Sequence, residues 1–490
     1  MTAPPAAQPA SRPASRPAFR LNVRPRFRRR ELGLLLVVAA ALFAGSVSLG
    51  ATQRAAAAKL AGDAAPAVTF APADVAILAA YLGVLFAAHL ALVLAGRRTD
   101  QILLPTVGLL GGIGLLLMER LPQTLAGSLG GLARTQLVWL VLSFSLITGL
   151  AIAVRNDAWL RRYKYTWAAI GVGLLLLAFV FGRDVNGARL SIVIGPLTGQ
   201  PSELLKVMLV VFLAGYLSEN RSLLVEESTR VGPFRLPPLP YLAPMVAMWA
   251  MALGIVVVQR DLGAALLFFL VFLLLLYVAT ARASFVVLGA IAAIIGGAIL
   301  YSLLGYVQTR VDIWLDPFAD PQGAGFQVVQ ALHAFARGGL IGTGLGAGLP
   351  TIGGRPPIPA LHTDFPFAAL GEELGLVGIL AILGLYLVVI ERGLRIAASA
   401  PDEFRSILAA GLSLVVGVQA FIIAAGNLKI VPLTGITLPF ISYGGSSLLV
   451  NGLVVGLLIA LSDKGAELMP PVPRRGRLGR LGRLVDRGAP

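Results

Sequence analysis

The chain consists largely of apolar runs, each about as long as one crossing of a lipid bilayer. A transmembrane helix needs about 20 predominantly apolar residues. On this basis we expect spans near residues 31–51, 73–95, 101–118, 134–154, 163–181, 202–218, 241–258, 262–279, 284–304, 366–390, 404–426 and 442–462. The sequence therefore predicts an all-α polytopic membrane protein with about 12 transmembrane helices.

Composition agrees with this class and argues against several others. Hydrophobic residues make up 57% of the 490 residues and charged residues only 13%, against about 25% charged in an average soluble domain. The net charge of +16 does not indicate a nucleic-acid binder, because Lys and Arg gather in the tails and in alternate loops. With no cysteine and three scattered histidines, any metal would be a hard cation held by carboxylates and substrate phosphates.

Basic residues in alternate loops define the topology, because cytoplasmic loops are enriched in Lys and Arg. The loops that we assign to the cytoplasm carry Arg97 and Arg98; Arg155, Arg161, Arg162 and Lys164; Arg221, Arg230 and Arg235; Arg282; and Arg392, Arg395 and Arg405. Residues 1–30 are expected to form a disordered basic arm and residues 464–490 a basic tail, both held against membrane lipid. Both termini are therefore predicted to be cytoplasmic, and the long loop 305–365 to lie outside.

The outer loop 305–365 gathers charged residues from Arg310 to Asp364. A helical apolar pattern over 326–335 predicts one short helix, and the glycines after it predict a flexible or closely packed backbone. Pro366 favours the first turn of a helix, so Asp364 is expected just outside the helix mouth, where the helix dipole would keep it ionised. On the residues alone, a capping carboxylate at Asp364 and a surface histidine at His362 are the alternative interpretations.

Several ionisable residues fall inside the predicted spans. Such groups are costly in a membrane unless they pair, reach the interface or face a polar cavity, so they mark candidate sites. Lys206 lies about one turn inside its span, behind Glu203, and snorkelling to the interface is its alternative role. Glu372 and Glu373 lie deeper in theirs and require cationic partners. The candidates for these partners are Lys206, Arg260 and Arg189.

Two further segments interrupt the apolar pattern. Arg260 and Asp261 adjoin in an outer turn, where they could pair with one another or with lipid headgroups. Near the end of the chain, prolines and a polar, glycine-rich run that includes Ser442 and Gly444 break an apolar stretch. Because broken backbone at membrane depth must be covered by protein or line a cavity, we expect this segment to pack near the same site.

Taken together, these motifs resemble the FtsW/RodA/SpoVE family of bacterial cell-wall synthesis. Any one motif would be weak, but their order along the chain is that of the family. The matching residues are Asn186 to Arg189, Gly195-Pro196, Gln200 to Glu203 with Lys206, Gln259 with Asp261 to Gly263, Asp316-Pro317, Asp320-Pro321, Gly325 with Gln327, His362 to Phe365, Gly371 to Gly375, and Pro439 to Ser446.

The resemblance implies a core of ten helices and a domain organisation around it. Residues 97–463 would form the family core, with the large outer loop 305–365. The two helices of residues 31–96 would be an N-terminal addition. Such an addition is similar to RodA-like members, which favours a role in cell elongation and shape over one in division.

The resemblance also implies an activity, that of an inverting peptidoglycan glycosyltransferase that polymerises lipid II at the outer face of the bacterial cytoplasmic membrane. Asp364 matches the family's catalytic carboxylate, and we assign it the role of base. Lys206, Arg189 and Arg260 would pair with this charge or meet the departing undecaprenyl pyrophosphate, with a divalent cation such as Mg²⁺ as a further candidate. The remaining candidate site residues are Glu203, Glu372, His362, Ser442 and Gly444, and the implied partner is a class B penicillin-binding protein, a transpeptidase.

Two other functions use similar residues. A flippase or transporter for a lipid-linked precursor also needs intramembrane charges and broken helices. A non-catalytic scaffold for a transpeptidase would need neither a base nor a leaving-group site. The polar residues collect on the outer side and the two halves of the chain are not similar, which favours the enzyme.

Overall fold

The computed structural model describes residues 25–61, 75–121, 131–155, 157–185, 188–194, 197–226, 229–231, 234–236, 259–348 and 358–463, with scattered positions between 243 and 257. The arm before residue 25 and the tail 464–490 lie outside these ranges. The helices are α1 (Arg29–Ala61), α2 (Ala76–Leu94), α3 (Leu103–Arg120), α4 (Leu132–Ala153), α5 (Ala158–Arg162), α6 (Lys164–Phe181), α7 (Pro201–Glu226), α9 (Leu262–Thr280), α10 (Ala283–Leu303), α11 (Gly305–Leu315), α12 (Phe326–Gly338), α13 (Pro366–Ala398), α14 (Glu403–Asn427) and α15 (Gly445–Leu461).

The helices confirm the polytopic α-helical class. In the described part of the chain, 10 helices are long and apolar enough to cross a membrane, and α15 is a shorter apolar helix. The predicted span at 241–258 falls mostly on residues outside the described ranges. The predicted count of twelve is therefore not confirmed. Each of the other predicted spans coincides with a helix, although α1, α7 and α13 end 8 to 10 residues beyond the predicted spans.

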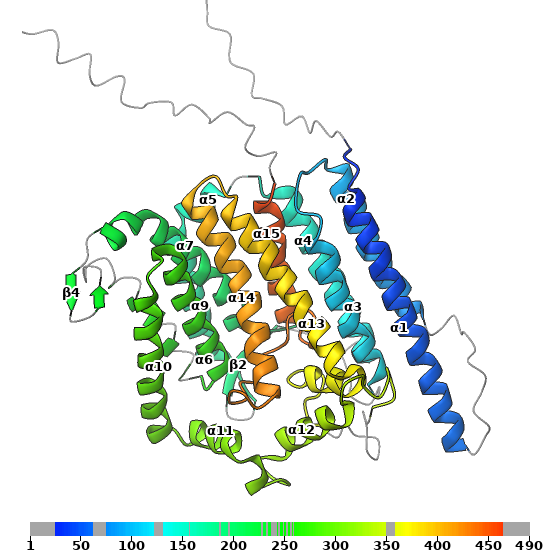
Figure 1. Ribbon diagram of the computed structural model, residues 1–490. Helices are drawn as coiled ribbons and strands as arrows, with labels where there is room; N and C mark the ends of the chain where they lie inside the picture. The colour runs from blue at the N-terminus through cyan, green and yellow to red at the C-terminus, as the bar shows by residue number, and fades with distance from the viewer. Residues whose placement is uncertain are drawn as a thin grey trace, which may run out of the picture.

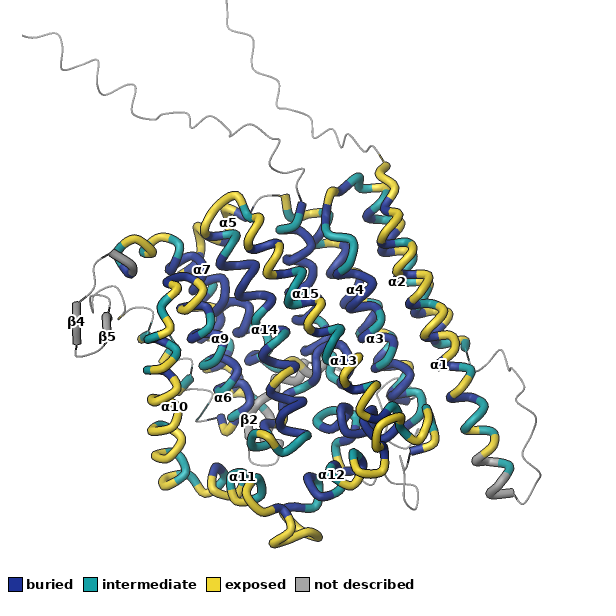
Figure 2. The backbone as a smooth tube through the Cα atoms, in the orientation of Figure 1, coloured by how far each residue is buried: buried dark blue, intermediate teal, exposed yellow. Residues whose placement is uncertain are grey.

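The helix α14 lies at the centre of the bundle, where it packs against α7, α9, α13 and α15 (Figures 1 and 2). Most of its residues are buried, as expected for a helix that is apolar on nearly every side. Different elements lie at the two ends of the bundle. The chain enters α1 and leaves α15 at one end, and α11 and α12 lie across the other (Figure 1).

The two N-terminal helices form an edge of the bundle, with α1 against α3 and α2 against α4 (Figure 1). The Tyr81 hydroxyl in α2 donates a hydrogen bond of 2.7 Å to the carbonyl of Gly108 in α3. One face of α1 is buried through Leu35, Val38 and Leu42. Its opposite face exposes large apolar side chains, as a helix facing lipid does.

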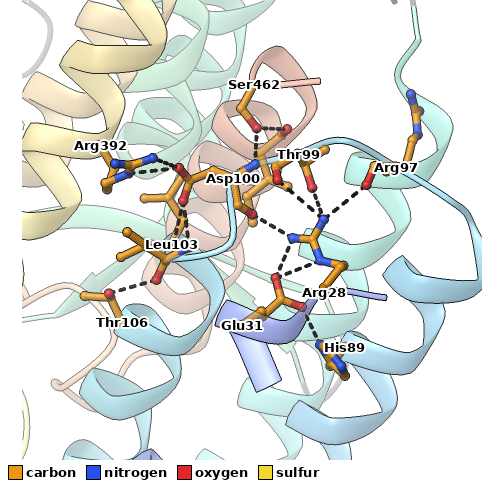
Figure 3. A network of polar contacts seen from close by, with 12 residues as sticks. Arg28, Glu31, His89, Arg97, Thr99, Asp100, Leu103, Thr106, Arg392 and Ser462 are labelled. Atoms are coloured by element: carbon orange, nitrogen blue, oxygen red, sulfur yellow. Dashed lines mark hydrogen bonds and ion pairs between the residues drawn. The ribbon is translucent and has the colours of Figure 1, made fainter. Parts of the chain in front are cut away.

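A group of buried polar side chains joins α1 to the core at the end where the chain enters (Figure 3). We call Arg28, Glu31, His89, Thr99 and Asp100 the clasp. The Arg28 guanidinium donates to Glu31 Oε2 at 3.0 Å, to Thr99 Oγ1 at 2.8 Å and to the carbonyl of Asp100 at 2.7 Å. His89 Nδ1 lies 2.6 Å from Glu31 Oε1. Arg28 falls within the stretch assigned to the disordered arm, yet its side chain is buried.

Short antiparallel strands occur in two loops, a feature that the all-α prediction did not include. The strands are β1 (Arg183–Val185), β2 (Ala188–Ile194), β3 (Leu197–Gly199), β4 (Thr229–Val231) and β5 (Phe234–Leu236). β2 pairs with both β1 and β3, and β4 pairs with β5. They are local hairpins, so the architecture is still that of a helical bundle.

The long loop before α13 contains more structure than predicted. The expected short helix is confirmed as α12 (Phe326–Gly338), but a further helix, α11 (Gly305–Leu315), follows directly on α10. A 3₁₀ turn, η2 (Pro317–Ala319), joins the two, and the Asp316 side chain caps it by accepting from the Phe318 amide at 3.0 Å. Together these elements lie across the end of the bundle opposite the clasp (Figure 1).

Candidate active site

Asp364 lies in a tight turn that leads into α13, at the helix mouth where the sequence placed it. The amides of Thr363 and Asp364 both donate to the carbonyl of Ala360, at 3.1 and 2.9 Å. From α14, the fully buried Asn427 donates its side-chain amide to the carbonyl of Asp364 at 3.0 Å. The backbone of Asp364 is thus fixed from two sides, and its half-buried carboxylate is left for other contacts.

The broken segment before α15 holds the same turn. The Ser442 hydroxyl donates to the carbonyl of Thr363 at 2.7 Å and accepts from the amide of Leu438 at 2.8 Å. The amide of Tyr443 donates to the carbonyl of His362 at 2.8 Å. The prediction that this segment packs near the site is confirmed, and Ser442 acts through the backbone of the turn. Gly444 comes next in the segment and precedes α15 as its N-cap residue.

Partial burial shifts the pKa values of Asp364 and His362 in this turn. Loss of water raises the pKa of Asp364 above its ordinary value of 3.8, and the Thr363 hydroxyl and the Arg310 guanidinium lower it by smaller amounts. The helix dipole was expected to lower this pKa, but desolvation has the larger effect, and the expectation that Asp364 is ionised stays a prediction. Burial also lowers the pKa of His362, whose ring lies 5.7 Å from the Tyr443 ring between centroids.

Arg310 is a further candidate site residue, one that the sequence did not single out. It belongs to α11, and its Nη1 donates to the carbonyl of Leu433 at 2.8 Å. Its charge acts on both Asp364 and Asp261. Arg310 also lines an apolar cavity of about 490 Å³. Other lining residues come from α9, α10 and α11 and include Leu262, Phe269, Ala292, Gly296 and Val307.

Lys206 is buried in a polar cluster of its own. Its Nζ donates to Glu203 Oε2 at 2.6 Å and to Gln419 Oε1 at 2.7 Å. Within the described residues these contacts replace the predicted pairing with Asp364, and the side chain does not snorkel. Lys206 and Asp261 both line one small cavity. Asp261 caps α9 by accepting from the Ala264 amide at 2.9 Å.

The partners that the structure shows for Glu372 and Glu373 are not the predicted Lys206 and Arg260. Glu372 accepts from Arg337 Nε of α12 at 3.0 Å, and Glu373 forms an ion pair with Arg120 at the end of α3. Neither arginine was predicted as a partner from the sequence, because only the packing of α3 and α12 on α13 brings them to these carboxylates.

Two of the three cations predicted for those carboxylates, Lys206 and Arg260, lie elsewhere. Lys206 is in its own cluster with Glu203 and Gln419. The Arg260 guanidinium instead lies 5.6 Å from the centre of the Tyr306 ring. The side chain of Arg189 is outside the described residues, so its predicted role stays a prediction.

The glycine-rich segment after α12 is closely packed, which decides between the two predicted alternatives. Residue Gly375 interrupts α13 with φ 64° and ψ −167°. The carbonyls of Glu372 and Glu373 therefore accept from the amides of Thr343 and Gly344, both at 3.0 Å. In return, the amides at 376 and 377 donate to the carbonyls at 339 and 340, at 2.9 and 3.1 Å. The loop backbone thus supplies the hydrogen bonds that the kink removes from the helix.

The site has few groups for a metal ion. Within the described ranges, no three His, Cys, Asp or Glu side chains come together in a way that could hold one. Single carboxylates such as Asp364 are available, and Mg²⁺ commonly binds through one or two carboxylates plus substrate phosphates.

Comparisons with known proteins match most of the chain. A family model named for FtsW, RodA and SpoVE, described as cell cycle protein, matches residues 100–466. The peptidoglycan glycosyltransferase RodA of Mycobacterium tuberculosis is 39% identical over 402 residues, or 81% of this chain and 84% of that protein. α1 and α2 precede the residues that the family model matches.

Two solved structures are similar as well. A chain from work on the structural coordination of polymerization and crosslinking by a peptidoglycan synthase complex has a TM-score of 0.60 and 28% identity, over 74% of this chain and 98% of that one. The crystal structure of the rod shape determining protein RodA of Thermus thermophilus has a TM-score of 0.50 and 25% identity, over 74% and 97%.

Proposed function

The chain belongs to the FtsW, RodA and SpoVE family and is a peptidoglycan glycosyltransferase, and we propose that it polymerises lipid II with Asp364 as the catalytic base. The observation that carries this proposal is the environment of Asp364. Its backbone is fixed by Asn427 and by the turn itself, while partial burial raises the pKa of its carboxyl group. A base whose pKa is raised towards the working pH accepts a proton more readily.

The reaction needs a base on one side of the bond and positive charge on the other. Asp364 takes the proton from the 4-hydroxyl of the acceptor N-acetylglucosamine as that oxygen attacks C1 of the donor N-acetylmuramic acid. The bond from C1 to the pyrophosphate oxygen breaks with inversion, and undecaprenyl pyrophosphate departs. Positive charge stabilises the anion as it forms.

Arg310 is better placed for that anion than Lys206. Lys206 is already engaged by Glu203 and Gln419. Arg310 acts electrostatically on Asp364 and borders the apolar cavity of about 490 Å³. A polyisoprenoid chain would suit such a cavity, because pockets for apolar ligands are mainly apolar with a few polar groups that fix orientation.

A divalent cation is a further part of the proposal. Asp364 could contribute one carboxylate oxygen, and the substrate pyrophosphate would supply most of the ligands. Bound there, the ion would neutralise part of the leaving group's charge.

The relatives and the loop charges support a biological setting. The 39% identity to a RodA and the RodA crystal structure support a role in cell elongation and shape. The neighbour from a peptidoglycan synthase complex supports a class B penicillin-binding protein as partner. The arginine-rich loops favour cytoplasmic termini, which would put the α11–α12 end outside, where lipid II is polymerised.

Polymerisation of labelled lipid II by the purified protein tests the proposal. We expect glycan strands from the wild type and a loss of about 10²- to 10⁴-fold in rate for Asp364→Asn, the range for removing a general base. Asp312→Asn is the matched control, because Asp312 is another carboxylate of the outer loop and bonds Tyr301 at 3.1 Å. Equal rates for Asp364→Asn and wild type would overturn the assignment. Transport of lipid II in vesicles without polymer would favour a flippase.

A further inference from the structure

A polar cavity of about 580 Å³ lies at the end of the bundle where the chain enters α1, away from the candidate active site. Four arginines line it. Arg30 comes from α1, Arg98 from the loop before α3, and Arg392 and Arg395 from α13. Thr99, Ser399 and Ser462 add hydroxyl groups to the lining. Such a lining offers hydrogen-bond donors suited to a phosphate group.

The clasp fixes the geometry of this cavity (Figure 3). Arg28 binds the carbonyls of Arg97 and Asp100, at 3.3 and 2.7 Å, so the loop that carries Arg98 is tied to the start of α1. The same contact places Arg30, two residues further along α1, on the cavity wall. Arg30 and Arg98 are therefore brought together by buried hydrogen bonds.

The charges around the cavity do not balance. Arg392 pairs with Asp100, and Arg395 pairs with Glu391. For Arg30 and Arg98, both exposed, the described part of the chain supplies no acidic partner. The cavity therefore has an excess of positive charge from two arginines on different elements.

An unsatisfied amide also lines the cavity. The side-chain oxygen of Gln101 is buried and has no hydrogen-bond partner among the described residues. Buried polar atoms are normally paired, so this oxygen is open to a hydrogen bond from a ligand or a water molecule. The Gln101 oxygen is thus a hydrogen-bond acceptor beside guanidinium donors. This combination suits a ligand with phosphate oxygens for the guanidinium groups and a hydroxyl group for the acceptor.

The two helices that border the cavity, α1 and α13, also carry exposed apolar side chains. On α1, Leu34 lies one turn from Arg30 and Val37 about two turns from it, and these side chains are 38 and 66% exposed. On α13, Leu394 is 40% exposed. A ligand with its phosphate at Arg30 and Arg98 would have room for hydrocarbon chains along these side chains, which a soluble phosphate would leave unused.

We propose that this cavity binds the headgroup of an anionic glycerophospholipid of the phosphatidylglycerol type. The phosphate contacts Arg30 and Arg98, and a glycerol hydroxyl donates to the Gln101 oxygen once that side chain turns into the cavity. Basic pockets between helices at the cytoplasmic membrane surface are suited to such headgroups. Because Arg30 lies before the residues matched by the family model, the site depends on the added helix α1.

Native mass spectrometry of the full-length protein, titrated with phosphatidylglycerol, tests the proposal. We expect one tightly retained phosphatidylglycerol and about 30-fold weaker binding for the double variant Arg30→Gln with Arg98→Gln, because each basic residue beside an anionic lipid contributes about a fivefold factor. Arg98→Gln alone should weaken binding about fivefold. The matched control is Arg161→Gln with Arg162→Gln, two exposed arginines of α5 at the same end of the bundle.

Competition with sn-glycerol phosphate separates a lipid from a soluble ligand. Retention of the lipid in excess glycerol phosphate, together with unchanged thermal unfolding of the variants, supports the proposal. Equal affinity of wild type and double variant would overturn it. An equal loss in the control pair, or displacement of the lipid by glycerol phosphate at equal concentration, would overturn it as well.

Discussion

The two ends of the bundle handle buried charge in opposite ways. In the clasp, the fully buried Arg28 and Glu31 satisfy one another and the surrounding carbonyls. At the other end, Asp364 is held by its backbone, and its half-buried carboxylate has only minor favourable contacts. Paired charge fixes structure, whereas incompletely neutralised charge is free to react. The comparison suggests that mutations should separate stability from activity between the two ends.

The largest effect on stability is expected at the clasp. Arg28→Ala would leave the Glu31 carboxylate buried with His89 as its remaining partner, which should cost about 3–5 kcal/mol of unfolding free energy. Denaturant unfolding in detergent micelles measures this. The exposed Arg29→Ala is the matched control and should change stability by less than about 0.5 kcal/mol. Polymerisation per folded molecule of Arg28→Ala should stay near wild type. A loss of activity at unchanged stability would contradict the proposed difference between the two ends of the bundle.

Substitution of Gly338, at the outer end of the bundle, should affect both stability and activity. A Cβ at Gly338 would lie 2.1 Å from the carbonyl oxygen of Gly371, so Gly338→Ala must push α12 away from α13. We expect a loss of about 1–3 kcal/mol, as in other overpacked sites, and slower polymerisation. Gly305→Ala is the control, because its Cβ would meet no atom within 4 Å. Equal stability and equal polymerisation rates of the two variants would show that α12 is not held in place by this contact.

Arg310→Gln should slow polymerisation about tenfold, or about 1.4 kcal/mol, within the range for one charged stabiliser. It should also move the acidic limb of the pH profile. Asp364 must be deprotonated to act as base, so activity falls as the pH drops through its raised pKa. Arg310 lowers that pKa, and its removal should shift the limb to higher pH. The control is Lys429→Gln, which removes another cation of the outer end and should leave the acidic limb of the pH profile in place. A shift of this limb to lower pH in Arg310→Gln would contradict the proposed effect of Arg310 on Asp364.

The smallest effect is expected at Asn427, which acts on Asp364 only through its backbone carbonyl. Asn427→Ala should cost about 1 kcal/mol of stability and slow polymerisation several-fold through a less fixed turn. Asn220→Ala is the matched control, because Asn220 also donates to a backbone carbonyl, that of Tyr216, at 2.9 Å. The control should lose stability without losing activity, and equal activity of the two variants would show that the turn needs no such support.

The sequence predicted local features well and contacts between distant residues poorly. The apolar runs predicted the helix boundaries, and the pattern at 326–335 predicted α12, because both depend on neighbouring residues. The position of Asp364 followed from Pro366. The partners of Glu372 and Glu373 did not follow from local sequence, because Arg120 and Arg337 reach them only after three helices have packed. The raised pKa of Asp364 was missed for the same reason, since burial is a property of the fold.

The kink at Gly375 has a mechanical consequence. The amides of Thr343 and Gly344 bond to α13, and the amides beyond the kink bond back to the loop. These hydrogen bonds link backbone to backbone, so the end of α12 and the first turns of α13 form one rigid body. A force applied to α12 is therefore transmitted directly to Glu372, and any opening of this end must pivot elsewhere, towards η2 and α11.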